Sequence, residues 1–157
     1  MLASQRAVRK MPRVTSADFL RTQGEPLQAL LRAEYEIAGA WHPLPGEADA
    51  NFKVSTNDGD YLVKVGASGA QSSLELQAAA VEHLAKNASS LPLTRTIANQ
   101  RGAPLSALEV DGEQRAVWVS RWLPGDLLAR QGVVEEDVLE QLGRQVGAMA
   151  RALTTFE

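Results

Sequence analysis

Apolar residues recur at helical spacing in the first part of the chain. Four of them are Leu27, Leu30, Leu31 and Tyr35. Pro26 stands just before this series, where a proline suits the first turn of a helix. A shorter helix is expected before it, beginning after a capping Ser16 and ending by Gly24. The pattern therefore predicts two consecutive helices with a break between them.

The pattern then changes to one typical of strands. Residues 41–44 predict a short strand, followed by a turn or loop over 44–47. Apolar and polar residues alternate over 51–56, and an apolar return strand follows over 61–65. The sequence Asn57-Asp58-Gly59 between them is a hairpin signal. These two strands are therefore predicted to be antiparallel neighbours.

A helix is predicted after the first hairpin. Ser72 and Glu75 have the spacing of a capping box, with Ser72 as the cap. The apolar stripe behind them consists of Leu74, Ala78, Val81, Leu84, Ala85 and Ala88. Because these positions share one helical face, the helix is expected to pack on the rest of the domain along that stripe.

Further strands and a last helix complete the chain. A strand is expected over 93–98, and a second hairpin over 105–110 and 115–123, turning at Asp111-Gly112. Pro124-Gly125 ends this hairpin. The last helix is expected to cover residues 135 to 153, with an apolar stripe of Val138, Leu142, Val146, Met149 and Leu153.

This order of elements predicts an α+β fold. One helix is inserted into a small antiparallel sheet of about five strands, and further helices flank the sheet at both ends of the chain. A parallel nucleotide-binding fold would instead alternate strands and helices throughout. We expect residues 1–15 to be a disordered tail, 16–130 to form the sheet domain, and 131–157 to form the last helix.

Composition narrows the class of protein. The chain has 157 residues, 45% hydrophobic and 22% charged, which suits one compact domain. Its 19 acidic and 16 basic residues give a net charge of −3, so no general attraction to nucleic acid or anionic lipid is expected. Zero cysteines exclude a disulfide framework and fit a cytoplasmic protein. No apolar run approaches the roughly 20 residues that cross a bilayer.

The common catalytic motifs are missing. None of the lysines follows a glycine as in a phosphate-binding Walker loop, and there is no dinucleotide-binding fingerprint. His42 and His83 are far apart and have no metal-ligand spacing, so each is expected to be structural or exposed. No serine stands in a nucleophile elbow.

Three features are candidates for a binding site. Lys64 lies within an apolar strand, where it is either a solvent-facing lysine or a cation that grips phosphate oxygens. Gln77 falls inside the apolar stripe of its helix, where it either bonds to the backbone or reaches and orients Lys64. Residues 120–125 end a strand abruptly at Pro-Gly, which exposes backbone groups to water or to the edge of a purine.

Several motifs together resemble one family of kinases. They are residues 44–52 (LPGEADANF), 61–65 (YLVKV), 75–77 (ELQ), Leu91-Pro92, and 122–125 (WLPG) followed by a helix. In this order they resemble the N-terminal lobe of the aminoglycoside phosphotransferase and choline kinase superfamily, a distant relative of protein kinases. Within that superfamily the sequence is most similar to hydroxylysine kinase-like phosphotransferases, including those fused to class-III aminotransferases. The resemblance covers residues 27 to 156.

The resemblance implies a nucleotide-binding role for individual residues. Lys64 matches the third-strand lysine that contacts the phosphates of ATP or GTP bound with Mg²⁺. Asp49, Asn51 and Phe52 lie in or just after the loop over those phosphates. The Arg121 C=O and Leu123 N–H match the backbone that recognises the base. Gln77 stands where the superfamily usually has the glutamate that pairs with this lysine. A glutamine can donate or accept a hydrogen bond but supplies no negative charge to Lys64. Glu75 is the alternative partner.

The resemblance also implies that this sequence lacks the catalytic lobe. In this superfamily a His-Gly-Asp-x-x-x-x-Asn loop and a later aspartate supply the base and the metal ligands, and no His-x-Asp occurs here. We therefore expect no catalytic or metal-binding residue in this chain and an inactive fragment. The expected acceptor is a hydroxyl of a small amino alcohol or amino acid. The alternatives are a non-catalytic kinase-like module that binds a partner, and an unrelated α+β binding domain.

Overall fold

The computed structural model describes residues 15–157, so the expected tail falls almost wholly outside the described residues. The elements are α1 (Ser16–Tyr35), β1 (Ala40–Leu44), β2 (Ala50–Thr56), β3 (Gly59–Val65), α2 (Gln71–Asn87), β4 (Leu105–Val110), β5 (Glu113–Arg121), η1 (Leu128–Arg130) and α3 (Glu136–Leu153). The strands form one antiparallel sheet in the order β1-β2-β3-β5-β4. The predicted α+β class and five-stranded sheet are confirmed.

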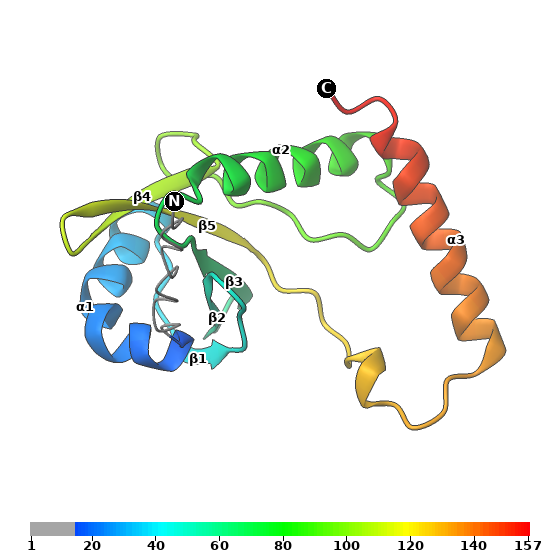
Figure 1. Cartoon of the computed structure of the whole chain (residues 1–157), viewed down its shortest axis with the longest axis horizontal. Coiled ribbons are helices and arrows are strands. Elements are labelled where there is room, and N and C mark those ends of the chain that lie inside the picture. Colours follow the sequence, from blue (N-terminus) through cyan, green and yellow to red (C-terminus); the bar gives the residue numbers. More distant parts are fainter. Residues whose placement is uncertain (1–14) are drawn as a thin grey trace, which may run out of the picture.

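The two faces of the sheet have different coverings (Figure 1). α1 covers one face, where its Phe19, Leu27 and Leu31 join the core with the fully buried Phe52 and Val63. Because side chains alternate along a strand, the neighbours of these core residues point to the other face. α2 lies on that second face and buries Leu74, Ala78 and Leu84. The second face therefore holds both α2 and the polar side chains of β2 and β3.

α1 is one continuous helix, so the predicted break at Gly24 and Pro26 is wrong. Its cap is Thr15, whose hydroxyl accepts a hydrogen bond from Asp18 N–H, and not Ser16. Phe19, before Pro26, and Leu27, after it, are both buried against the sheet. This packing on both sides of Pro26 outweighs the helix hydrogen bond that is lost because proline has no N–H. Ser16 is buried, and its Oγ accepts a hydrogen bond from Asn51 N–H at 3.0 Å.

Two further expectations are wrong between β3 and β5. α2 begins at Gln71 with Ala70 as its N-cap, so Ser72 caps nothing. Residues 93–98 do not form a strand; they make a single bridge, Thr96 to Ser120, beside the end of β5. β4 already occupies that edge of β5 up to the pair Leu105–Trp118, which leaves only the last residues of β5 for this segment.

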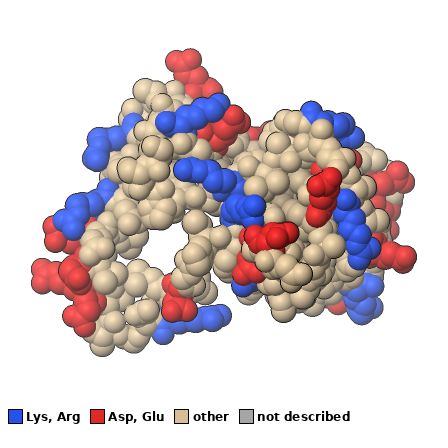
Figure 2. All heavy atoms as spheres, turned by 180° about the vertical axis from the view of Figure 1, so that it is seen from behind, with Lys and Arg blue, Asp and Glu red and all other residues tan. Residues whose placement is uncertain are grey.

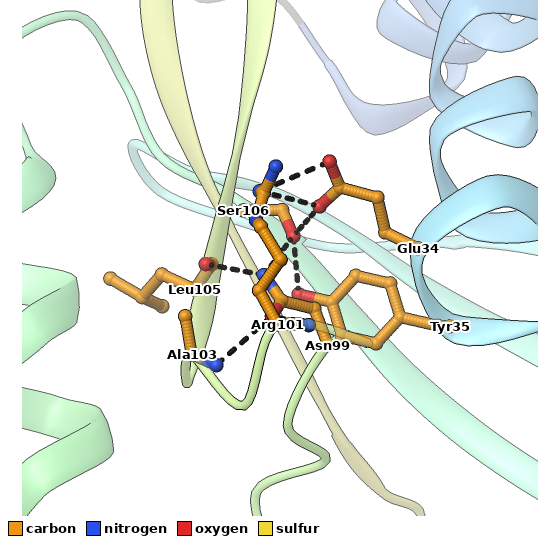
Figure 3. Close-up of polar contacts among 7 residues, drawn as sticks. All are labelled: Glu34, Tyr35, Asn99, Arg101, Ala103, Leu105 and Ser106. Carbon is orange, nitrogen blue, oxygen red and sulfur yellow. Dashed lines mark hydrogen bonds and ion pairs between the residues drawn. The ribbon is translucent and has the colours of Figure 1, made fainter.

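A polar network centred on the buried Ser106 ties α1 to the β4 edge of the sheet (Figure 3). The Ser106 hydroxyl contacts a Glu34 carboxylate oxygen and lies 2.9 Å from the Tyr35 hydroxyl. Asn99 Nδ2 donates to Ser106 Oγ at 3.0 Å, and Arg101 forms an ion pair with Glu34 at 3.1 Å. Since buried polar groups are costly without partners, this network fixes the register of α1 on the sheet.

Tyr35 should make the stability of the domain sensitive to alkaline pH. Burial raises the pKa of the Tyr35 hydroxyl above its ordinary value of 10.0. Above that pH the unfolded chain releases this proton more readily than the folded chain, so stability is lost as the pH rises through the folded pKa. Denaturant unfolding of Tyr35→Phe at pH 9 and pH 11 should therefore show a smaller alkaline loss than the wild type. Tyr61→Phe, which retains Tyr35, should show the full loss.

The C-terminal part stands away from the sheet. In Figure 1 the segment after β5 leads through η1 to α3, which approaches the body near the end of α2. There His83 Nε2 lies 2.9 Å from the Ala152 carbonyl oxygen, and the Phe156 ring packs edge-on against His83 at 5.3 Å. Figure 2 shows an opening between this arm and the body, bordered mostly by uncharged atoms. No residue of α3 is buried, although its bounds are close to those predicted.

Candidate nucleotide-binding site

Lys64 is held at the centre of the second face of the sheet. It lies on β3 between Asn51 of β2 and Trp118 of β5, its partners in the antiparallel register. Its Nζ donates to Gln77 Oε1 of α2 at 3.0 Å and lies 3.5 Å from Asp49 Oδ2. The Lys64 and Asp49 side chains are each 20% exposed, so the ammonium group is largely enclosed and still reachable from solvent.

The expected contact between Gln77 and Lys64 is present. Gln77 also donates from Nε2 to Ser73 Oγ at 3.3 Å, one helical turn earlier, which orients its amide oxygen toward Lys64. Glu75 is exposed and accepts a hydrogen bond from Gln71 instead, so it is not the partner. An ammonium group has three donor protons, and Gln77 takes one of them. The Asp49 carboxylate lies within ion-pair distance of the same group, at 3.5 Å, so Lys64 keeps at least one donor for an anionic ligand.

The loop over this site depends on Gly46. A Cβ at Gly46 would lie 2.3 Å from the Asp49 carbonyl oxygen and 2.6 Å from Asn51 Nδ2. Asn51 Nδ2 donates to the carbonyl oxygens of Pro45 and Asp49, at 3.4 and 3.3 Å. Asp49 Oδ1 in turn accepts from Ala67 N–H at 3.1 Å. The loop is therefore closed by its own side chains, beside the ammonium group of Lys64.

The segment after β5 presents backbone groups on alternating sides. Arg121 N–H donates to the Arg95 carbonyl, and Trp122 N–H donates across to Asp60 of β3. The Arg121 carbonyl accepts from Thr94 Oγ1 at 2.6 Å. Leu123 N–H has no hydrogen-bond partner within residues 15–157. β5 ends at Arg121, two residues earlier than predicted, so Leu123 lies in the following extended segment.

A cleft of about 660 Å³ opens beside this segment. Its walls include Leu44 of β1 and Leu62 of β3, with Thr94 and Arg121 at the sheet side and Leu127 on the linker. Leu62 and Lys64 are two residues apart on β3 and so share a face. The cleft is therefore continuous in the sheet with the position of Lys64, and its apolar walls suit a flat aromatic ring.

A charged pair stands near one end of the cleft. Lys53 Nζ lies 2.7 Å from Asp60 Oδ2 and 5.1 Å from the centre of the Trp122 ring, and Trp122 lines the cleft. The hydrogen bond from Lys53 lowers the pKa of Asp60 below its ordinary value, with a smaller contribution from Ser55. Lys53 therefore holds β3 and the segment after β5 together at this end.

The structure gathers most of the predicted site residues. Asp49, Asn51, Lys64 and Gln77 meet at one point, and Arg121 and Leu123 border the cleft. Phe52 is the exception, because its side chain is fully buried on the α1 face, 5.5 Å from the Trp41 ring. Sequence reasoning missed Leu44, Leu62, Thr94 and Leu127, which line the cleft. Of these four, only Leu62 could have been found from the sequence, because it lies two residues from Lys64 on the same predicted strand.

Metal and membrane sites have no counterpart in the part of the chain that the structure describes. Within residues 15–157, no group of three or more histidine, cysteine or acidic side chains could hold a metal ion. Across the same residues, no helix has the length and apolar character needed to span a bilayer.

The arrangement defines a kinase-like N-terminal lobe: an antiparallel sheet, an inserted helix whose side chain holds a strand lysine, and a cleft at the end of the last strand. The profile of the phosphotransferase enzyme family matches residues 40–157. The chain therefore belongs to this family. A comparison with proteins of curated function gave no match.

Solved structures agree with this fold at low sequence identity. An amicoumacin kinase in complex with AMP-PNP, Ca²⁺ and Ami has a TM-score of 0.65 and 15% sequence identity, over 87% of this chain and 42% of that one. A spectinomycin phosphotransferase with ADP and spectinomycin has a TM-score of 0.59 and 12% sequence identity, over 79% of this chain and 36% of that one. A putative aminoglycoside phosphotransferase from Ralstonia eutropha has a TM-score of 0.51 and 17% sequence identity, over 80% of this chain and 37% of that one. The chain thus spans less than half the length of these structures.

Proposed function

We propose that this chain is the nucleotide-binding N-terminal lobe of a cytoplasmic phosphotransferase that uses ATP or GTP with Mg²⁺. The observation that carries the proposal is the Lys64 ammonium group, fixed by Gln77 at 3.0 Å on the face that also forms the cleft. Structurally similar kinases were solved with AMP-PNP and ADP, which supports the same class of ligand here.

Each part of the nucleotide has matching groups in the site. The base would lie between the apolar walls at Leu44 and Leu62, with the Leu123 N–H as a free donor at its edge. Lys64 would bind phosphate oxygens, and the loop closed by Asn51 would lie over them. Mg²⁺ would neutralise charge on the phosphates during transfer. Its protein ligands and the base that accepts the hydroxyl proton would come from a C-terminal lobe.

The acceptor substrate is proposed to be a hydroxyl of a small amine or amino acid. The support is the resemblance to hydroxylysine kinase-like phosphotransferases, carried by residues 44–52, 61–65 and 75–77. The structurally similar amicoumacin kinase and spectinomycin phosphotransferase were solved with the small molecules Ami and spectinomycin, which supports a small-molecule acceptor here. The lobe alone is expected to bind nucleotide weakly and to transfer no phosphate.

Titration with Mg-ATP tests the nucleotide site. NMR spectra of the wild-type chain should shift at Lys64, Gln77, Arg121 and Leu123 as Mg-ATP rises into the millimolar range. Lys64→Ala removes a charged donor to phosphate, so it should weaken binding about tenfold or more. Lys86→Ala is the matched control, because Lys86 is an exposed lysine of α2 that pairs with Glu82. Equal effects of the two substitutions would contradict the proposed role of Lys64.

A second candidate is a non-catalytic kinase-like module that binds a partner, including one fused to a class-III aminotransferase. Two observations favour it. Gln77 supplies no charge to Lys64, and the linker and α3 expose apolar side chains, with Val133 81% and Val146 54% exposed. A folded chain whose spectrum stays unchanged with millimolar Mg-ATP would favour this module over the nucleotide lobe.

A further inference from the structure

Thr94 contacts the backbone at the polar edge of the cleft. It lies between α2 and β4, and its Oγ1 is 2.6 Å from the Arg121 carbonyl oxygen. Both residues line the cleft. A carbonyl oxygen has no proton, so Thr94 must be the donor. The single proton of the Thr94 hydroxyl is therefore committed to Arg121, and only its lone pairs remain for a ligand.

The other polar groups at this edge are largely used within the protein. Arg121 N–H donates to the Arg95 carbonyl at 2.9 Å, and Trp122 N–H donates to the Asp60 carbonyl at 3.0 Å. The Arg121 carbonyl keeps a second lone pair. Leu123 N–H is without a partner in the described part of the chain. Among the backbone groups at this edge, a ligand therefore meets the Leu123 donor next to the Arg121 acceptor, with the Thr94 lone pairs beside them.

We propose that Thr94 determines base specificity by favouring a purine with an amino group at position 6 over one with a carbonyl there. This inference rests on the proposed nucleotide site. The amino group of adenine has two protons, one for each acceptor, and the adjacent ring nitrogen accepts from Leu123 N–H. In the same position guanine directs its carbonyl at two acceptors and its ring N–H at the Leu123 donor. Such unpaired polar contacts are costly once the bound base excludes water from them.

Rotation of the Thr94 hydroxyl does not rescue guanine. A proton turned toward the guanine carbonyl would leave Arg121, and the hydrogen bond at 2.6 Å would be lost. The Arg121 carbonyl oxygen would then face the guanine oxygen with no proton between them. Thr94 thus acts both directly, through its lone pairs, and through Arg121, whose carbonyl it holds in place.

Three ligands and two substitutions test this role. We would titrate the chain by NMR with the Mg²⁺ complexes of ATP, GTP and purine riboside triphosphate, which lacks the amino group. The wild type should bind ATP about tenfold more tightly than either of the others. Thr94→Val removes the hydroxyl with little change in shape and should reduce this preference to about threefold. Thr94→Ser, which retains the hydroxyl, should restore the preference, and Thr22→Val on α1 should not alter it.

The outcomes separate this inference from the proposed function. Equal affinity of the wild type for ATP and GTP would overturn the role of Thr94 and leave the nucleotide site standing. A uniform loss for all three ligands in Thr94→Val would also overturn it, because Thr94 would then only maintain the shape of the cleft. If no ligand shifts the spectrum of the folded wild type, the proposed function fails, and this inference fails with it.

Discussion

Replacing Phe52 with alanine is expected to lower the free energy of unfolding by about 3–5 kcal/mol. Phe52 is fully buried on β2, and its ring packs against Phe19 at 6.1 Å and Trp41 at 5.5 Å. The substitution removes this aromatic packing and leaves a cavity between α1 and the sheet. Urea denaturation at neutral pH should therefore show a much lower midpoint with a similar slope.

Two other substitutions separate packing from function. Phe52→Leu keeps most of the volume and should cost much less than Phe52→Ala. Leu76→Ala removes a leucine of α2 that is 60% exposed, and its effect should stay within about 0.5 kcal/mol. If Phe52→Ala left stability unchanged while abolishing nucleotide binding, Phe52 would belong to the binding site as the sequence suggested.

Gly39→Ala is expected to destabilise the domain by about 3 kcal/mol, although Gly39 is exposed. A Cβ at this position would lie 2.1 Å from the Ser55 carbonyl oxygen and 2.8 Å from its carbonyl carbon. Both are backbone atoms of β2, beside the first pair of the β1–β2 ladder, Ala40 with Ser55. Relief of the clash requires β1 to separate from β2, which breaks ladder hydrogen bonds.

Gly132→Ala provides the matched control for this effect. Gly132 lies in the linker before α3, and within residues 15–157 no atom beyond Gly132 and its two chain neighbours lies within 4 Å of a Cβ there. Its substitution should be neutral or slightly stabilising, because alanine reduces the freedom of the unfolded chain. Thermal unfolding of the two variants should therefore differ by several degrees. Equal melting temperatures would show that β1 adapts to the Cβ without cost.

Local patterns were enough to predict the two hairpins of the sheet. Alternation over residues 51–56 and the turn at Asn57-Asp58-Gly59 correctly gave the first hairpin, and Asp111-Gly112 gave the second. The wrong expectations concern features that depend on distant contacts. The continuous α1 depends on packing that outweighs Pro26, and residues 93–98 fail to form a strand because β4 already pairs with β5.

The candidate site was partly predictable for the same reason. The position of Gln77 inside an apolar helical stripe indicated that it needed a polar partner, and the structure supplies Lys64. Phe52 adjoins Asn51 in sequence, but the alternation of a strand sends the two side chains to opposite faces. Thr94 had no local signal, because only the fold brings it to Arg121, 27 residues later in the chain.

The pairing of β3 with β5 has a consequence for the order of folding. β1, β2 and β3 are joined by short connections, and β4 and β5 form a hairpin of their own, so both units can form from local contacts. Pairing β3 with β5, which places Lys64 beside Trp118, closes a long loop that contains α2. Closing this loop costs more chain entropy than forming either local unit. We therefore expect Lys64, Gln77 and the cleft to be assembled together in the last step, so that any nucleotide that binds here selects fully folded chains.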